Sequence, residues 1–263
     1  MAFLLRLWFF VAGGMHHPEM LLRVDVLNCM AVSLALAALF GHRAARGTWN
    51  LAPVALGLAI SFASPLVAAR WPASWGQTVP LAYVYGDRPI SVFPLFPWAA
   101  FTLVGLGAGT LWSSSRDPAV QRRIMTGTGL AGAALTLVGW ALWGPQHAWY
   151  AHVDAWRTGP AYFLMRVGLL FALCAAAWAA HLRARPGAWS WVRQLGTTSL
   201  FVYWVHLELV YGKLARPLLG RLTLPTTFAG FAVLTAAMLA LSVGKTRFTA
   251  WRAARAARPA TTP

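Results

Sequence analysis

Residues 161–181, AYFLMRVGLLFALCAAAWAAH, decide the fold class, because they form a long apolar run with one arginine inside it, Arg166. A helix that crosses a bilayer needs ~20 mostly apolar residues. Six further runs of this kind meet or approach that length: 24–41, 51–69, 90–112, 124–143, 195–212 and 224–243. The sequence therefore predicts an all-α, polytopic transmembrane helical bundle with seven full spans.

The composition excludes an ordinary soluble domain. Apolar residues make up 59% of the 263-residue chain and charged residues 11%, whereas soluble domains carry about a quarter charged residues. The net charge of +16 could indicate nucleic-acid binding, but the arginines lie between apolar runs, so we expect no nucleic acid. Cys29 and Cys174 fall inside apolar runs, which leaves no disulfide framework and no metal-ligand spacing.

An eighth apolar run, residues 2–14, is predicted to form one short N-terminal span. Arg6 interrupts it and Gly13-Gly14 closes it. At ~1.5 Å per residue it reaches only about 20 Å, less than the ~30 Å of a bilayer core. It could be the apolar core of a signal peptide. We favour the other interpretation, the tail of a helix whose beginning is missing.

The distribution of lysine and arginine predicts the orientation, since cytoplasmic loops are enriched in both. The segments 42–50, 113–123, 182–194 and 244–263 hold 13 cations, and the alternate segments hold seven. We therefore place the first set and the C-terminus in the cytoplasm, in a bacterial cytoplasmic membrane. Residues 1–243 would be one transmembrane domain, and residues 244–263 a basic tail that contacts anionic lipid.

Ionisable residues inside membrane spans are costly and therefore indicate function. In the predicted topology they gather in the outer half of the bilayer: Arg23, Asp25, Asn28, Arg166, His206 and Glu208. Next to them lie residues of the outer segments: His16, His17, Glu19, His147, His152 and Asp154. We predict one polar chamber at or near the outer face. A purely structural alternative has Arg23 and Asp25 anchoring a helix end, and Arg166 snorkelling outward or neutralising Glu208.

His206 is the candidate for acid–base or nucleophilic chemistry. Tyr203 precedes it by three positions, which places both on one helical face. Glu208 follows it by two and therefore points nearly the opposite way. A histidine here could act as a general base or accept an acyl group. It could equally be a hydrogen-bonded packing residue.

Two glycine patterns and one histidine pattern are weaker indicators of function. Residues 127–132 match G-x-G-x-x-G, but a dinucleotide site needs a preceding strand. Inside a span such glycines favour close helix packing, and we predict the same for Gly105-x-x-x-Gly109. His147, His152 and Asp154 lack the spacing of ligands on one helical face, so no metal site is expected.

Three blocks of sequence resemble the heparan-α-glucosaminide N-acetyltransferase-like family of membrane acyltransferases. They are residues 22–28 (LRVDVLN), residues 93–98 (FPLFPW) running into Gly105, Gly107 and Gly109, and residues 195–206 (LGTTSLFVYWVH). The third is similar to the family's Ser-Leu/Ile-x-Val-Tyr-x-x-His signature. Together they cover roughly residues 20 to 243 in the family's order.

The resemblance implies a multi-span enzyme that uses acetyl-CoA from the cytoplasm. It would acetylate an amine or hydroxyl of a sugar, in a glycan or glycolipid, on the opposite side of the membrane. His206, Tyr203 and Asp25 would be catalytic, Asp25 by orienting an arginine. Substrate-binding residues would be Arg23, Asn28, Arg166, Glu208 and Trp98, with the arginines on phosphate or carboxylate groups.

The chain departs from the family at its start. Family members carry further N-terminal helices with an Asp-x-x-Arg-Gly-like block and a nearby acetyl-accepting histidine, and residues 1–22 contain neither. His16 and His17 do not match that histidine. Two alternatives to an enzyme therefore stay open. One is a transporter or flippase for an anionic solute with Arg166 and Glu208 as a gating pair. The other is a non-catalytic partner subunit. The expected partners are membrane lipid, the sugar or glycolipid acceptor, and either a second copy in a homo-oligomer or a partner chain.

Overall fold

The computed structural model describes residues 7, 11, 24–44, 51–76, 78, 81–86, 90–184, 187, 189–211 and 221–256, with the backbone alone at 40–44, 76, 208, 211 and 256. Within these ranges the chain forms eleven helices and no strand beyond one isolated bridge. The all-α prediction is confirmed. The chain divides into two compact units, Met1–Arg183 and Ala184–Pro263, which are described in turn.

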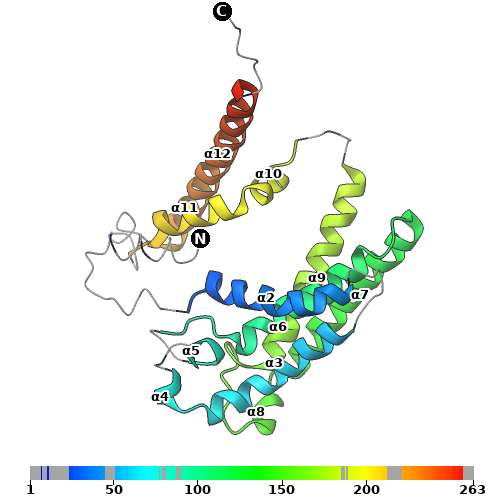
Figure 1. The fold of residues 1–263 in the computed structure, drawn as a ribbon, viewed down its shortest axis with the longest axis vertical. Helices are drawn as coiled ribbons and strands as arrows, with labels where there is room; N and C mark the ends of the chain where they lie inside the picture. The colour runs from blue at the N-terminus through cyan, green and yellow to red at the C-terminus, as the bar shows by residue number, and fades with distance from the viewer. Residues whose placement is uncertain are drawn as a thin grey trace, which may run out of the picture. The chain divides into compact units, whose positions relative to one another are not determined.

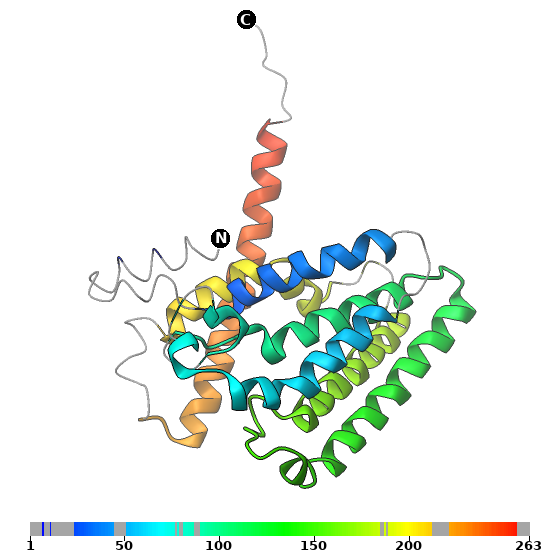
Figure 2. The same cartoon turned by 60° about the horizontal axis from the view of Figure 1, so that its bottom comes forward.

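Within its described residues, the first unit contains five helices of 18 residues or more and three of four residues. Four of the long helices run side by side in Figures 1 and 2: α3 (Ala52–Arg70), α6 (Leu95–Trp112), α7 (Pro118–Ala141) and α9 (Pro160–Arg183). The fifth is α2 (Val26–Ala44), and the short ones are α4 (Ala73–Gly76), α5 (Leu81–Val84) and α8 (Gln146–Trp149). The second unit contains α10 (Trp191–Thr197), α11 (Ser199–Tyr211) and α12 (Leu224–Ala256).

Five helices are long and apolar enough to cross a membrane: α3, α6, α7, α9 and residues 224–255 of α12. The chain is therefore an integral membrane protein. Seven full spans are not shown. The apolar part of α2, Val26–Leu39, is shorter. The predicted run 195–212 is divided at Thr198 between α10 and α11, and the 13 residues of α11 extend only about 20 Å. Almost all of residues 2–14 lies outside the described residues.

Small residues bring α7 and α9 into close contact. A Cβ added to Gly132 would lie 2.7 Å from the carbonyl oxygen of Gly168, and one added to Gly139 would lie 2.6 Å from that of Ala161. Such positions let helix backbones approach each other in a membrane. The packing predicted for the 127–132 glycines is confirmed at Gly132. At Gly127, by contrast, an added Cβ would meet no described atom within 4 Å.

The prediction that Gly105 and Gly109 form a packing face is wrong. An added Cβ would meet no described atom within 4 Å at either position. Gly107, between them, lies directly against Val54 of α3, where an added Cβ would overlap the valine side chain. Positions four apart share one helical face, and here that face points away from α3.

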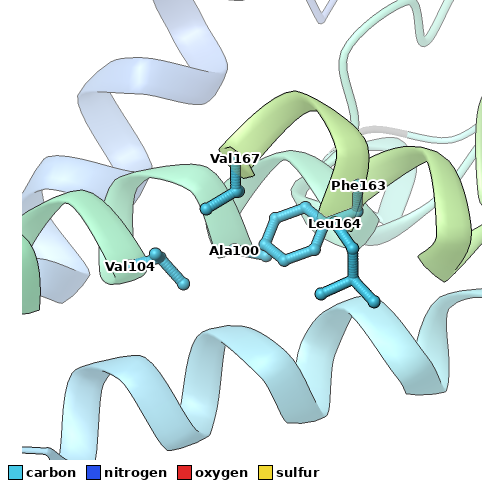
Figure 3. Packing of buried hydrophobic residues seen from close by; sticks show 5 residues of the cluster. All are labelled: Ala100, Val104, Phe163, Leu164 and Val167. Atoms are coloured by element: carbon cyan, nitrogen blue, oxygen red, sulfur yellow. The ribbon is translucent and has the colours of Figure 1, made fainter. Parts of the chain in front are cut away.

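The buried core of the first unit joins α6 to α9. It consists of Ala100, Val104, Phe163, Leu164 and Val167, each at most 5% exposed. Figure 3 shows the α9 side chains beside Ala100 and Val104. Because these residues occupy one face of α9, Arg166 is left on a different face of the same helix.

A backbone bridge ties the segment before α2 to the segment before α6. The Val24 amide donates to the Ile90 carbonyl at 2.7 Å, and the Val92 amide donates to the Val24 carbonyl at 3.0 Å. Ser91, which faces Val24 across this bridge, is fully buried, and its hydroxyl donates to the Ala82 carbonyl at 2.7 Å. The bridge therefore places the start of α2 next to the start of α6.

In the second unit a polar cluster joins α10 to α12. The Gln194 amide nitrogen donates to the hydroxyl oxygens of Ser242 and Thr246, each at 2.9 Å. Ser242 is fully buried and its hydroxyl also contacts that of Thr198. Buried hydroxyls are stable in such a place when they are hydrogen-bonded, so this cluster holds the segment that precedes α11 against α12.

Candidate functional site

Arg166 is half-buried on α9, where aromatic rings surround its charge. Its Nη2 donates to the hydroxyl oxygen of Tyr162, one turn earlier, at 2.6 Å. Its guanidinium carbon lies 3.9 Å from the centroid of the Tyr162 ring and 5.4 Å from that of Trp98. Ring faces attract cations. Within the described part of the chain, no carboxylate lies within ion-pair distance of Arg166, and the side chains that contact its charge there are the aromatic residues Tyr162 and Trp98.

A cavity of about 430 Å³, which we call the Arg166 cavity, lies beside this guanidinium. Three elements line it: α2, the start of α6 and α9. The lining residues are Val26, Cys29, Met30, Ser33, Phe93, Trp98, Phe101, Thr102, Arg166, Leu169 and Leu170. Arg166 is the single charged residue in this lining. In a low-dielectric environment such a cation attracts a negative charge far more strongly than in water.

Trp98 contributes a second hydrogen-bond donor to this region. Its indole Nε1 is buried and has no hydrogen-bond partner within the described part of the chain. Its ring is fixed by Phe93, at 4.8 Å between centroids, and by Phe101, at 5.7 Å. Buried polar groups are normally paired. Trp98 is therefore a lining residue of the Arg166 cavity whose indole donor is unsatisfied within the described residues.

The structure brings together some of the predicted site residues and not others. Trp98 and Arg166 share the Arg166 cavity. Asp25 and Asn28 lie at the start of α2 but do not line it, although their neighbours Val26 and Cys29 do. Asp25 accepts from the Val26 amide at 2.7 Å, and Asn28 is 5% exposed. Arg23 and the side chain of Glu208 lie outside the described residues.

A second cavity in the same unit, about 630 Å³, is polar, and we call it the loop cavity. It lies between the end of α3, the residue after α5, and the 147–158 segment. Its polar lining residues are Tyr85, His147, Tyr150, His152, Asp154 and Thr158. The predicted topology places His147, His152 and Asp154 near the chamber, but they are not among the predicted site residues. Among the described residues, no three His, Cys, Asp or Glu side chains are arranged to hold a metal ion.

Hydrogen bonds shape the loop cavity. Asp154 Oδ1 accepts from the amides of Trp156 at 3.0 Å and Arg157 at 3.1 Å. The Tyr150 hydroxyl donates to the Phe62 carbonyl of α3 at 2.9 Å, and burial raises the pKa of Tyr150. Arg157 Nη2 donates to the carbonyls of Gly86 and Ser91. Tyr150 is therefore a neutral donor at ordinary pH, and the cavity wall is joined to the segment before α6.

Tyr203 and His206 lie together in the second unit, as their spacing predicts, with ring centroids 5.6 Å apart. His206 Nδ1 lies 2.8 Å from the Tyr203 carbonyl oxygen. A carbonyl oxygen only accepts, so Nδ1 carries a hydrogen, and in the neutral imidazole this tautomer leaves the lone pair on Nε2. That tautomer suits a general base. Arg166 and His206 belong to different units, and their predicted convergence stays a prediction.

Comparison with known families agrees with the membrane helices. Residues 1–143 match the family described as heparan-alpha-glucosaminide N-acetyltransferase, catalytic. The chain belongs to this family of membrane acetyltransferases, which use acetyl-CoA. The match includes the first two resembling blocks, residues 22–28 and 93–98, whereas residues 195–206 lie outside it. No curated protein and no solved structure matches the chain.

Proposed function

We propose that this protein transfers an acyl group from acetyl-CoA, or another acyl-CoA, to an amine or hydroxyl of a sugar in a cell-envelope glycan or glycolipid. Family membership supports the reaction type. The observation that carries the proposal is Arg166, a cation without a described carboxylate partner in the wall of an apolar cavity. Acyl transfer develops negative charge on the thioester oxygen, and fixed donors that meet such charge are a large source of catalysis.

The Arg166 cavity suits the acyl-thioester end of the donor. Its walls are apolar apart from Arg166, Trp98 and the hydroxyls of Ser33 and Thr102. A diphosphate would need several cations, whereas a thioester carbonyl needs one or two donors. We assign Arg166 and Trp98 to that carbonyl oxygen. Arg23 then binds a phosphate group of the donor, as the family resemblance implies.

In the proposed step the acceptor nitrogen or oxygen attacks the thioester carbon. A new C–N or C–O bond forms and the C–S bond breaks. His206 Nε2 takes the proton from the attacking group, and the CoA sulfur leaves as a thiolate that is then protonated. The Nδ1 bond to the Tyr203 carbonyl fixes the tautomer that this role needs. Tyr203 and Asp25 act as positioning residues, and Asn28 and Glu208 are substrate-binding residues.

The loop cavity suits the acceptor. Tyr85 and Tyr150 supply aromatic surface, and His147, His152 and Asp154 supply donors and acceptors. This combination fits a polyhydroxylated ring with an apolar face. We keep the seven-span topology in this proposal, with a cytoplasmic C-terminus, an orientation that the arginine distribution supports. Reporter fusions after residues 115 and 152 test this topology, since the two fusion points should lie on opposite sides of the membrane.

The reaction is tested with the full chain in lipid nanodiscs, acetyl-CoA as donor and glucosamine as acceptor, by measuring free CoA thiol. We expect acceptor-dependent thiol release that falls about 100-fold in Arg166→Gln. Arg183→Gln, at the exposed end of the same helix, is the matched control and should keep the wild-type rate. Equal rates for wild type and His206→Ala would remove His206 from the mechanism. Solute uptake without CoA release would contradict the proposal and favour a transporter.

A further inference from the structure

A third cavity, about 360 Å³, lies between the helix pairs α3–α6 and α7–α9, and we call it the interpair cavity. Its inner wall is formed by aliphatic and aromatic side chains from all four helices, among them Leu58, Val104, Leu135 and Leu164. The polar atoms in the wall are already paired. Trp112 Nε1 donates to Thr128 Oγ1 at 3.0 Å, and that hydroxyl donates to the Ile124 carbonyl at 2.9 Å. The interior therefore offers no group to a polar ligand.

One end of the interpair cavity is basic. Arg123 is the single charged lining residue, and it is exposed near the start of α7. Leu51 before α3 and Trp112 at the end of α6 line the same end, so Arg123 stands where three helices begin or end. No hydrogen bond or ion pair joins Arg123 to another described residue. The nearby Asp117 carboxylate is already used by the Ala119 amide at 2.7 Å.

An apolar interior with one cation at its rim fits an amphiphile. We propose that the interpair cavity holds an acyl chain of an anionic phospholipid from the surrounding membrane, with the headgroup phosphate on Arg123. Basic pockets between membrane helices on the cytoplasmic side bind anionic headgroups in this way. The arginine distribution predicts that this end of α7 faces the cytoplasm. This site is separate from the Arg166 cavity and does not depend on the proposed function.

Two observations favour a membrane lipid over other amphiphiles: the bilayer surrounds these helices, and the start of α7 is positively charged. The bilayer presents acyl chains directly to α7 and α9, whose residues Leu130, Leu137 and Leu173 are more than half exposed. Arg116 and Arg122 add positive charge near the same end of α7. A phosphodiester headgroup complements that charge, and the bound chain fills space that would otherwise lack van der Waals partners.

The chain offers two matched pairs of variants for a test. Arg123→Gln removes the rim cation, whereas Arg122→Gln removes an adjacent exposed arginine that does not line the cavity. Gly127→Leu fills the cavity, because Gly127 lines it and an added Cβ there meets no described atom within 4 Å. Gly105→Leu is its control, since Gly105 is equally open but lies outside the lining.

Full-length protein is reconstituted in nanodiscs of phosphatidylcholine and phosphatidylglycerol, and native mass spectrometry counts the lipid retained after mild activation. We expect wild type, Arg122→Gln and Gly105→Leu to keep one phosphatidylglycerol. Arg123→Gln should lower its retention about fivefold, and Gly127→Leu should abolish it. Circular dichroism checks that all variants are folded.

Three results would overturn the inference. The first is equal retention by all variants. The second is a loss in Arg122→Gln as large as in Arg123→Gln, which would indicate general surface charge and no site. The third is displacement of phosphatidylglycerol from wild type by palmitoyl-CoA at low concentration, which would assign the cavity to the chain of a donor substrate.

Discussion

The Arg166 guanidinium lies over the ring of Tyr162, 3.9 Å from its centroid, and donates to the hydroxyl oxygen of the same side chain. One aromatic residue therefore supplies both a cation–π contact and a hydrogen bond. Tyr162 is in turn packed by Trp156, at 5.0 Å between centroids, and by Trp143, at 6.1 Å. The charge of Arg166 is positioned by side chains that carry no charge themselves.

Tyr162→Phe should remove the hydrogen bond to Arg166 and keep the cation–π contact. The ring stays, but the hydroxyl that accepts from Arg166 is lost, and hydrogen bonds to charged groups contribute about 1.5–3 kcal/mol. We expect acceptor-dependent CoA release to fall about tenfold, with a larger fall in Tyr162→Leu. Trp189→Phe, which changes an exposed tryptophan of the second unit, is the control. Equal rates in Tyr162→Phe and wild type would mean that the hydroxyl does not position Arg166.

Gly168→Ala should destabilise the first unit. An added Cβ would lie 2.5 Å from the Gly132 carbonyl oxygen and 2.6 Å from the Thr136 amide nitrogen. Overpacking of this kind costs about 1–3 kcal/mol, so the unfolding temperature in detergent should fall by several degrees. Gly127→Ala is the matched control, because its Cβ meets open space. It should be neutral or slightly stabilising, since alanine favours helix over glycine.

Tyr150 should make stability decrease at high pH. Burial raises the pKa of its phenol above the usual 10.0, so the folded chain holds this proton more tightly than the unfolded chain. The contribution is fully present below about pH 10 and is lost as the pH rises through the raised value. Thermal unfolding of Tyr150→Phe between pH 8 and 11 should therefore show a shallower decline than wild type.

The same variant has a second effect at neutral pH. Tyr150→Phe removes the hydrogen bond to the Phe62 carbonyl, which should cost about 1 kcal/mol of unfolding free energy. A wild-type pH profile in Tyr150→Phe would show that this phenol is not the group that titrates.

Ser242→Ala should loosen the second unit. The buried hydroxyl accepts from Gln194 and contacts that of Thr198, so its removal breaks hydrogen bonds between α10 and α12, at about 0.5–1.5 kcal/mol each. Hydrogen exchange of the α10 amides should accelerate. The control is Thr249→Ala, an exposed position on α12 where the hydroxyl bonds only the Lys245 carbonyl. Unchanged α10 exchange in Ser242→Ala would contradict the role of the cluster.

The sequence predicts the membrane helices well, because apolar length is a local property of the chain. It predicts poorly which face of each helix contacts a neighbouring helix. The spacing of Gly105 and Gly109 shows that they share a face, but only the position of Val54 shows that the contact is made by Gly107. The break at Thr198 within the run 195–212 coincides with the polar residues Thr197, Thr198 and Ser199, which carry no charge and therefore did not end the predicted run.

For the site, the cost of charge in lipid identifies Arg166 from sequence alone. Its partner Tyr162 was missed, although an aromatic residue four positions before an intramembrane arginine is a usable signal. Trp98 was found through the family resemblance and not through periodicity. The loop cavity could not be predicted, since it depends on how the 147–158 segment folds back onto the end of α3.

The Val24–Ser91 bridge has a mechanical consequence. Arg157, beside the loop cavity, holds the Ser91 carbonyl, and Ser91 faces Val24, two residues before Val26 in the wall of the Arg166 cavity. A chain of hydrogen bonds thus connects the two compartments. We expect a molecule that displaces the 154–158 turn to shift Val24, and with it the start of α2, as well.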